Sequence, residues 1–396
     1  MKHHLEHFHE MKTLTRKGKF LILSLFPLYF IVIGLVIQPF PDILKGLIRI
    51  VIEPDLLITD YFAVGGIGAA MINAGIITLI SLAMIYFLKM EMSGHTITAV
   101  FLMFGFSLFG KNIMNIWAIL AGVFLYSRYH KTSFHRYLYI GLYGTSLSPI
   151  MTQIMQIGHL PVYARVLISL AVGISIGFVL PPLSTHVHYA HNGYSLYNVG
   201  FAAGIIATVV VSLEKSFGIR IESRLIWSKG NQELFAVLLS LFFGTMIAAA
   251  VAVRGKTLWE SYRRILADPG LAGADFFKAE GGATTVFNMG INGLFATFFV
   301  LMVGGDMNGP TICGILTIVG FSSTGKHIRN IAPVMFGVYL ASFTKKWISM
   351  IRLPFWPFFF RPRWRRLREN SESWRDLLQG ISIPLWLCRW GSSMEA

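Results

Sequence analysis

Two lysines inside apolar stretches are the residues whose type and spacing most directly suggest chemistry in this chain. Each follows a glycine and precedes an asparagine by four residues, in GKNIMN at 110–115 and GKHIRN at 325–330. A lysine at membrane depth is energetically costly, so it usually faces a cavity or a partner. Lysine and asparagine four residues apart would share one helical face, and two such pairs would line a site for an anionic or strongly polar solute near the membrane midplane. The residues of this lining are Lys111, Asn115, Lys326 and Asn330.

The alternative is that each Gly-Lys marks a turn at the membrane surface, with the lysine extended to lipid phosphates. A hairpin would put the turn part-way into the membrane, whereas a crossing helix followed by a surface helix would put it at the interface. The copies also differ, since Arg329 stands where the first copy has Met114. Any site built from both copies would therefore be asymmetric.

An Asn-x-Gly motif occurs at the entry of three apolar segments. Asparagine is a good helix cap and glycine allows a broken or closely approached backbone. In a bilayer such breaks occur where protein or a water-filled cavity lines them, which predicts a discontinuous helix whose end points at a substrate or ion. The alternative is close helix packing by small residues. The copies are Asn73 with Gly75, Asn288 with Gly290, and Asn198 with Gly200.

Acidic and histidine residues offer two further candidate sites. Asp60 and Asp275 precede glycine-rich entries, where a carboxylate would bind a coupling cation or cap a helix start, and the cap is the simpler interpretation. The segment STHVHYAHNGY carries His186, His188 and His191, a spacing that would suit a metal or a proton relay. No carboxylate stands near them in the sequence, which favours interfacial polar residues.

These motifs fall in two segments that align without a gap at an offset of 215 residues. Residues 60–127 match residues 275–342 at 23 of 68 positions, and RIVIEPDL at 49–56 aligns with RILADPGL at 264–271. Duplicated apolar segments interrupted at matching Gly and Asn positions are typical of transporters and channels with a site between the repeats. A re-entrant stretch at 96–127 would make the repeat inverted and a single crossing would make it parallel, and the sequence leaves this open.

The elements that must position these residues are membrane spans. Near-uncharged runs of about 20 residues, long enough to cross a bilayer, recur along the chain, and two stretches of 32 residues, 96–127 and 311–342, are broken midway by Gly-Lys. We predict an all-α, polytopic transmembrane protein with two homologous repeats, discontinuous or re-entrant helices and about nine to eleven spans. The uninterrupted runs are 20–37, 65–88, 138–156, 166–183, 196–213, 234–253 and 281–303.

Composition excludes a soluble globular protein and argues against a nucleic-acid partner. Charged residues make up 13% of the chain, against about 25% in soluble domains. The net charge of +15 comes largely from short connecting segments, as in the cytoplasmic loops of membrane proteins. No nucleotide-binding, metalloprotease or serine-hydrolase motif is present, and we expect no cofactor or metal. The expected partners are the lipid bilayer and a small polar solute or ion, and the oligomeric state stays open.

The predicted organisation ends in an atypical tail. Residues 347–396 are rich in Arg and Trp and do not resemble the continuation of the first repeat at 128–213. They form either an amphipathic membrane-surface segment or the product of a reading frame that shifted near residue 346, and the abrupt change of composition favours the second interpretation. The expected units are a basic tail at 1–18, a first repeat at 19–213, a polar connector at 214–233, an incomplete second repeat at 234–346 and the tail at 347–396.

At the Asn-x-Gly and Gly-Lys-x-x-x-Asn motifs, together with YNVGFAAG at 197–204, the chain resembles a bacterial family of multi-pass membrane proteins catalogued as domain of unknown function 1576. The resemblance covers about residues 15–346. It implies a duplicated, multi-pass protein of the bacterial inner membrane with no assigned substrate. The tail after residue 346 departs from what the second half of that family should show.

The sequence as a whole predicts a secondary transporter or channel in the cell membrane for a small polar or anionic solute, with its site at the repeat interface. One rival is an integral-membrane enzyme acting on a lipid-type substrate through the histidine segment and Asp60 or Asp275. Another is a non-transporting membrane scaffold. The predicted solute-binding residues are Asn73, Gly75, Lys111, Asn115, Asn288, Gly290, Lys326 and Asn330, with Asp60 and Asp275 as ion ligands or helix caps.

Overall fold

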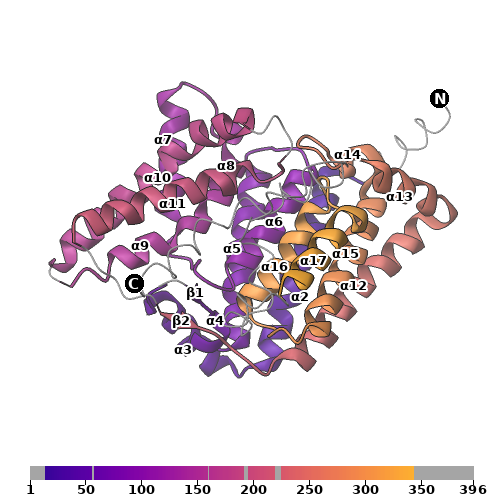
Figure 1. Cartoon of the computed structure of the whole chain (residues 1–396), viewed down its shortest axis with the longest axis horizontal. Coiled ribbons are helices and arrows are strands. Elements are labelled where there is room, and N and C mark those ends of the chain that lie inside the picture. The colour runs from indigo at the N-terminus through magenta and orange to yellow at the C-terminus, as the bar shows by residue number, and fades with distance from the viewer. Residues whose placement is uncertain (1–13, 56–57, 159, 191–194, 219–223, 343–396) are drawn as a thin grey trace.

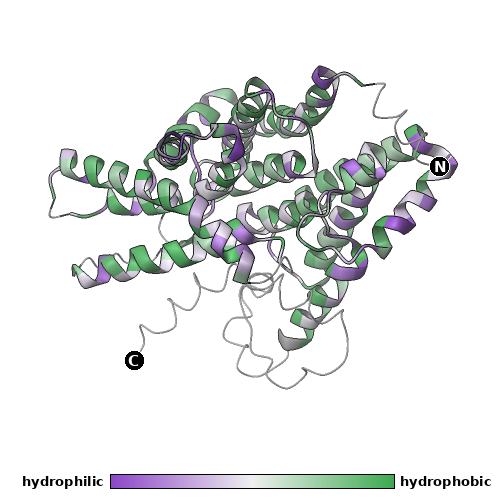
Figure 2. Ribbon diagram, turned by 90° about the horizontal axis from the view of Figure 1, so that it is seen from above, coloured by the Kyte–Doolittle hydropathy of each residue, from purple (hydrophilic) through white to green (hydrophobic). Residues whose placement is uncertain are grey.

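The computed structural model of the chain is all-α and polytopic. It describes residues 14–55, 58–158, 160–190, 195–218 and 224–342, so the tail at 347–396, most of the basic tail at 1–18, and His191 lie outside the described residues. Among the described residues, 6 helices are long and apolar enough to cross a membrane. Hydrophobic residues cover most of the length of the long helices (Figure 2).

The aligned segments contain equivalent helices in the same order, which begin and end within a few residues of matching positions. The first half contains α2 (Arg16–Ile37), α3 (Phe40–Ile52), β1 (Ile58–Thr59), α4 (Tyr61–Val64), α5 (Ile67–Phe87), α6 (Gly94–Phe106), α7 (Trp117–Tyr129), α8 (Leu138–Gly144), α9 (Pro149–Ile154), α10 (Val162–Ala190) and α11 (Asn198–Ser216). The second half contains β2 (Leu225–Ile226), α12 (Gln232–Arg254), α13 (Leu258–Ala267), α14 (Phe276–Glu280), α15 (Gly282–Met302), α16 (Gly309–Phe321) and α17 (Ile328–Ser342). The bounds of α15 and α16 are those of α5 and α6 shifted by 215 residues.

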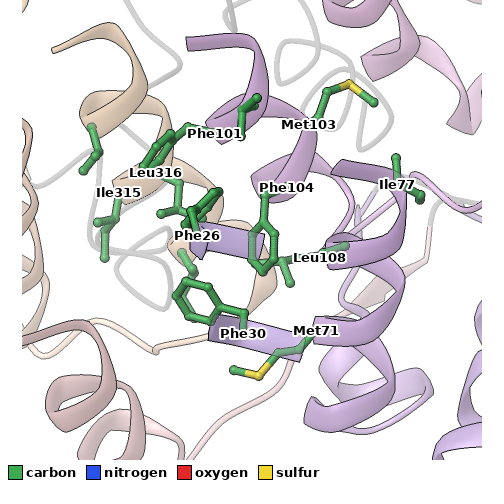
Figure 3. Packing of buried hydrophobic residues seen from close by; sticks show 14 of the residues in the cluster. Phe26, Phe30, Met71, Ile77, Phe101, Met103, Phe104, Leu108, Ile315 and Leu316 are labelled. Carbon is green, nitrogen blue, oxygen red and sulfur yellow. The ribbon is translucent and has the colours of Figure 1, made fainter. Parts of the chain in front are cut away.

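Two short helices, α6 and α16, pack against each other at the centre of the molecule, and longer helices flank them (Figure 1). α5 packs on α6 and α2, and α15 packs in the same way on α16 and α12. Where the halves meet, Phe26 of α2 stacks on Phe101 of α6 with ring centroids 4.1 Å apart, and lies 5.5 Å from the ring of Phe242 of α12. Figure 3 shows this buried cluster with Ile315 and Leu316 of α16. One hydrophobic core therefore joins both halves.

Helices α7 to α11 form a second cluster with its own buried apolar residues. α7 packs on α10 along small residues: a Cβ added at Gly122 would lie 2.1 Å from the carbonyl oxygen of Ile174, and one added at Gly177 would lie 2.0 Å from that of Ile119. Small residues let the two helix backbones approach closely. At Gly337 of α17, which aligns with Gly122, an added Cβ would meet no described atom within 4 Å.

The run at 138–156 does not form the single spanning helix predicted from its hydropathy. α8 ends at Gly144, a 3-10 turn covers Thr145–Leu147, and α9 begins at Pro149. Pro149 stands at the start of α9, where its missing N–H costs no helical hydrogen bond. The turn leaves the end of α8 beside α6, where it contacts Lys111.

Candidate functional site

The central helices α6 and α16 run antiparallel. The start of α6 lies against the end of α16, because a Cβ added at Gly94 would lie 2.4 Å from the carbonyl oxygen of Ser323. The start of α16 lies against the end of α6, because a Cβ added at Gly309 would lie 2.6 Å from the carbonyl oxygen of Leu108. Leu108 and Ser323 stand 215 residues apart, as do Gly94 and Gly309. The contacts at the two ends of the pair are therefore reciprocal.

Two carboxylates connect the halves at these ends. Each accepts an N–H from the short helix that follows it and one from the first residue of the central helix of the other half. The donors are Phe62 and Gly309 for Asp60, at 3.1 Å each, and Lys278 and Gly94 for Asp275, at 3.1 and 3.0 Å. Asp60 also accepts the N–H of Ser228, at 2.9 Å, from the connector that pairs with β1. Carboxylates are stabilised at helix N-termini, and these contacts are those of a cap.

Each central helix ends in a break that an asparagine of the adjacent long helix closes. We call residues 107–116 the first break loop and residues 322–327 the second break loop. The Asn73 amide of α5 donates to the carbonyl oxygens of Ser107 and Lys111 at 2.8 and 2.9 Å, and the Asn288 amide of α15 donates to those of Ser322 and Lys326 at 2.8 Å each. A helix end frees such carbonyls, and a buried carbonyl without a donor is costly. The two asparagines therefore bind the backbone of the breaks.

Asn115 and Asn330 fold the break loops rather than sharing a helical face with the lysines. The amide of Asn115 donates to the carbonyl oxygen of Gly110 at 3.0 Å, and that of Asn330 donates to the carbonyl oxygen of Gly325 at 2.9 Å. The prediction of a Lys-Asn helical face is wrong, because residues 110–116 and 325–327 are not helical. Gly110 has φ of 81° and Gly325 of 144°, a region that favours glycine and stops the helix.

Gly75 and Gly290 lie on the sides of α5 and α15 that face the outer helices. A Cβ added at Gly75 would lie 2.3 Å from Cγ1 of Ile31 on α2, and one added at Gly290 would lie 2.7 Å from Cγ1 of Ile247 on α12. Their contacts are those of close helix packing. The structure thus separates these glycines from the break loops.

The side chain of Lys111 is buried between α6 and α8. Lys111 is 1% exposed, and its Nζ lies 3.5 Å from Sδ of Met103, 3.5 Å from the carbonyl oxygen of Leu142 and 5.1 Å from the ring centroid of Phe106. The hydroxyl of Thr145 lies at the same place, 3.6 Å from Sδ of Met103. Among the described residues no carboxylate is within ion-pair distance of Lys111. The amino group of Lys111 is therefore buried without a counter-ion in the described part of the chain.

Lys326 is also buried, and it lies beside the start of α11. Its Nζ is 5.7 Å from the ring centroid of Tyr197, and that ring packs edge-on against Phe321 with centroids 4.5 Å apart. The third Asn-x-Gly copy, at 198–200, thus stands next to the second break loop. Since α6 and α16 are antiparallel and each is about 20 Å long, the two break loops lie at opposite ends of the pair. The Lys111 ammonium reaches back along α6 to Met103.

The structure does not bring the described histidines of the segment, His186 and His188, close to Asp60 or Asp275. His186 and His188 lie on α10, which packs on α7, α8, α9 and α11, whereas Asp60 and Asp275 bind α16 and α6. His188 pairs with the side chain of Asn198 at 3.2 Å. Among the described residues no group of three His, Cys, Asp or Glu side chains is placed to hold a metal ion.

Sequence reasoning missed two residues beside the break loops. Asp55 bonds Asn115 of the first break loop, and Tyr197 contacts Lys326. A signal for Asp55 was present, because its aligned position in the second half is Gly270. The two halves therefore differ in charge at this aligned position.

Comparison with known proteins gives one match. One family model matches residues 40–216 and 254–353, which is more than half of the chain. No curated protein and no solved structure is significantly similar to the chain.

Proposed function

Because the chain belongs to the family described as a protein of unknown function (DUF1576), its activity has to be inferred from its own geometry, and we propose that it is a secondary transporter or gated channel of the cell membrane for a small anionic or polar solute. The observation that carries this proposal is the antiparallel pair of broken helices at the centre of the molecule. Transporters place solute and ion sites at such discontinuous helices, between two structural repeats.

The contacts of α6 and α16 support an inverted repeat. Equivalent helices that run antiparallel, with each half capping the central helix of the other, are related by an axis perpendicular to those helices. If α6 and α16 cross the membrane, that axis lies in the membrane plane, as in inverted-topology transporters. The two break loops then face opposite sides of the membrane, which suits alternating access.

The burial of Lys111 favours an anionic solute. A buried ammonium group without a counter-ion is unfavourable unless another group compensates its charge. Its described neighbours are a sulfur, a carbonyl oxygen and a ring face. An anion bound beside Lys111 supplies the compensation, whereas the Thr145 hydroxyl already donates to the carbonyl oxygen of Leu142 at 2.6 Å. Lys326, whose Nζ lies 5.7 Å from the ring centroid of Tyr197, gives the second half a cationic group of its own.

The test is solute uptake by the full chain in proteoliposomes, with inorganic phosphate, sulfate, succinate, glycine and glycerol as probes. Replacing Lys111 with methionine removes the partner of a buried charge, which costs about 2–5 kcal/mol, so saturable uptake of the preferred anion is expected to fall about 30-fold or more. Lys326→Met is expected to lower uptake in the same direction. Lys45→Met is the control, because the Lys45 side chain is 69% exposed.

Misfolding is not expected to explain the loss. A methionine of similar volume in place of a buried ammonium group is often neutral or stabilising, so Lys111→Met should unfold no earlier than the wild type in detergent micelles. Unchanged uptake in both lysine variants would remove the lysines from the solute path. An absence of saturable uptake for every probe would favour the membrane enzyme or the scaffold.

A further inference from the structure

The carboxyl group of Asp55 is buried where three elements of the first half meet. Asp55 is 3% exposed. Its oxygens accept hydrogen bonds from the Tyr61 hydroxyl of α4 at 3.0 Å, the Thr152 hydroxyl of α9 at 3.2 Å and the Asn115 amide at 3.4 Å. Asp55 therefore ties α4 and α9 to the first break loop, which carries Lys111.

This carboxyl group is not needed to build a break loop. The aligned position in the second half is Gly270, where an added Cβ would lie 2.4 Å from the carbonyl oxygen of Gly325 and 2.8 Å from Nδ2 of Asn330. The second break loop nevertheless has the same Asn330–Gly325 hydrogen bond as its counterpart in the first. Asp55 is thus an addition to the shared architecture, and its role belongs to the first half alone.

The hydrogen bonds around Asp55 are compatible with both protonation states. The Thr152 hydroxyl lies 3.2 Å from Oδ2 of Asp55 and 2.9 Å from the carbonyl oxygen of Pro149, and it has one hydrogen to donate. When Asp55 is ionised, the Thr152 hydroxyl donates its hydrogen to Oδ2 of Asp55. When Asp55 is protonated on Oδ2, the Thr152 hydroxyl accepts that proton in a hydrogen bond and donates its own hydrogen to the carbonyl oxygen of Pro149.

Proton binding changes the tie to the first break loop. A proton on Oδ2 weakens that oxygen as an acceptor for the Asn115 amide, which keeps its bond to the carbonyl oxygen of Gly110. Tyr61 donates to the other oxygen and keeps its hydrogen bond, which is stronger to the charged carboxylate than to the neutral carboxyl group. The loop is therefore attached to Asp55 more firmly when the carboxyl group is charged.

The surroundings set the titration in a physiological range. Asp55 lies between α3 and α4, outside the spanning helices. Burial raises the pKa of Asp55 to about 7, against the hydrogen bonds from Tyr61 and Thr152, which lower it, and the nearby Glu53 raises it further. Glu53 is paired with Arg224 at 2.8 Å. The first break loop and α9 contact the carboxyl group of Asp55 through the uncharged side chains of Asn115 and Thr152. The next residue of α9, Gln153, bonds Glu214 of α11.

We propose that Asp55 binds and releases the coupling proton of this transporter, and that the change in its charge alters how firmly the first break loop and Lys111 are held. The inference rests on the proposed transport function, since coupling requires a solute that moves. Proton binding itself is measurable without any solute. Proton binding by Asp55 and solute transport can therefore be tested separately.

The test is infrared difference spectroscopy of the full chain in lipid nanodiscs, titrated from about pH 5 to about pH 9. Subtracting the Asp55→Asn spectra from those of the wild type cancels other buried carboxyl groups such as Glu214, and the remaining carbonyl band of protonated Asp55 is expected to disappear with a midpoint of about 7. Tyr61→Phe keeps the carboxyl group but removes a donor to its charged form, so the midpoint is expected to rise. Tyr143→Phe is the matched control, because the Tyr143 hydroxyl bonds the carbonyl oxygen of His95 instead.

A titrating band that is identical in Asp55→Asn would overturn the inference, as would an unchanged midpoint in Tyr61→Phe. Either result leaves solute transport standing. If the band behaves as expected and a proteoliposome probe is transported, its accumulation driven by a pH gradient should be lost in Asp55→Asn while downhill exchange persists. If no probe is transported, the proposed function fails although Asp55 titrates.

Discussion

Replacing Gly122 with alanine is expected to lower the unfolding temperature of the protein by about 3–5 °C, which corresponds to a loss of about 3 kcal/mol at this chain length. The added Cβ would lie 2.1 Å from the carbonyl oxygen of Ile174 and 2.9 Å from Cα of Gly177. Both atoms belong to the backbone of α10, so no side-chain rotation relieves the clash. The helices α7 and α10 must move apart along their whole contact. Thermal unfolding in detergent micelles measures the effect.

The matched control is Gly337→Ala, at the aligned position of α17. Its added Cβ meets no described atom within 4 Å, and alanine is a better helix former than glycine by about 1 kcal/mol. The control is therefore expected to be neutral or slightly stabilising. Equal losses at both positions would contradict the packing seen in the structure, because the two glycines share their sequence context and differ in what faces them.

Replacing Asn73 with aspartate is expected to destabilise the protein by about 2–6 kcal/mol, because two buried carbonyl oxygens lose their donor at about 1–3 kcal/mol each. The carboxylate has the shape of the amide but only accepts hydrogen bonds, so it repels the carbonyl oxygens of Ser107 and Lys111. Asn73→Ala leaves the same carbonyls unpaired without the repulsion and should be milder. Solute uptake is expected to fall with stability, since the first break loop positions Lys111.

Asn198→Ala is the control for this series. Asn198 belongs to the third Asn-x-Gly copy, but the contact that the structure gives its amide is with the ring of His188, not with a break loop. It is expected to change the unfolding temperature much less than Asn73→Ala. An Asn73→Asp protein that unfolds at the same temperature as the wild type would show that the hydrogen bonds from Asn73 to the carbonyl oxygens of Ser107 and Lys111 contribute nothing to stability. The corresponding pair in the second half, Asn288→Asp and Asn288→Ala, should repeat the order.

Local pattern was enough to predict most of the long helices of this protein. Apolar runs long enough to span a bilayer gave α2, α5, α11, α12 and α15 to within four residues, whereas α10 extends seven residues beyond the end of the run at 166–183. Gly-Lys predicted where the two 32-residue stretches break. These features depend on residues close together in the chain, namely hydropathy over one helix length and the conformational preference of glycine. The prediction of one helix over 138–156 was wrong because hydropathy does not distinguish a single helix from two helices joined by a turn, here at Thr145–Leu147.

The partners of the motif residues could not be predicted in the same way. The Asn73 amide bonds carbonyls 34 and 38 residues away, and Asp60 bonds an N–H 249 residues away. Such contacts depend on how α5, α6 and α16 pack, and no local pattern encodes that packing. The sequence suggested that Asn73 faces a solute, whereas the structure gives its amide to the backbone of the first break loop.

The sequence by itself determined the class of molecule and which polar residues stand inside its apolar segments, because hydropathy and a gap-free alignment need no knowledge of the fold. The tertiary structure decided where those residues point. It set α6 against α16 in opposite directions, which separates the two Gly-Lys turns to opposite ends of the pair. It also showed Asp55 beside the first break loop, a position that depends on how α4 and α9 meet at that loop. Charge and shape at a site come from distant segments, and only packing brings these together.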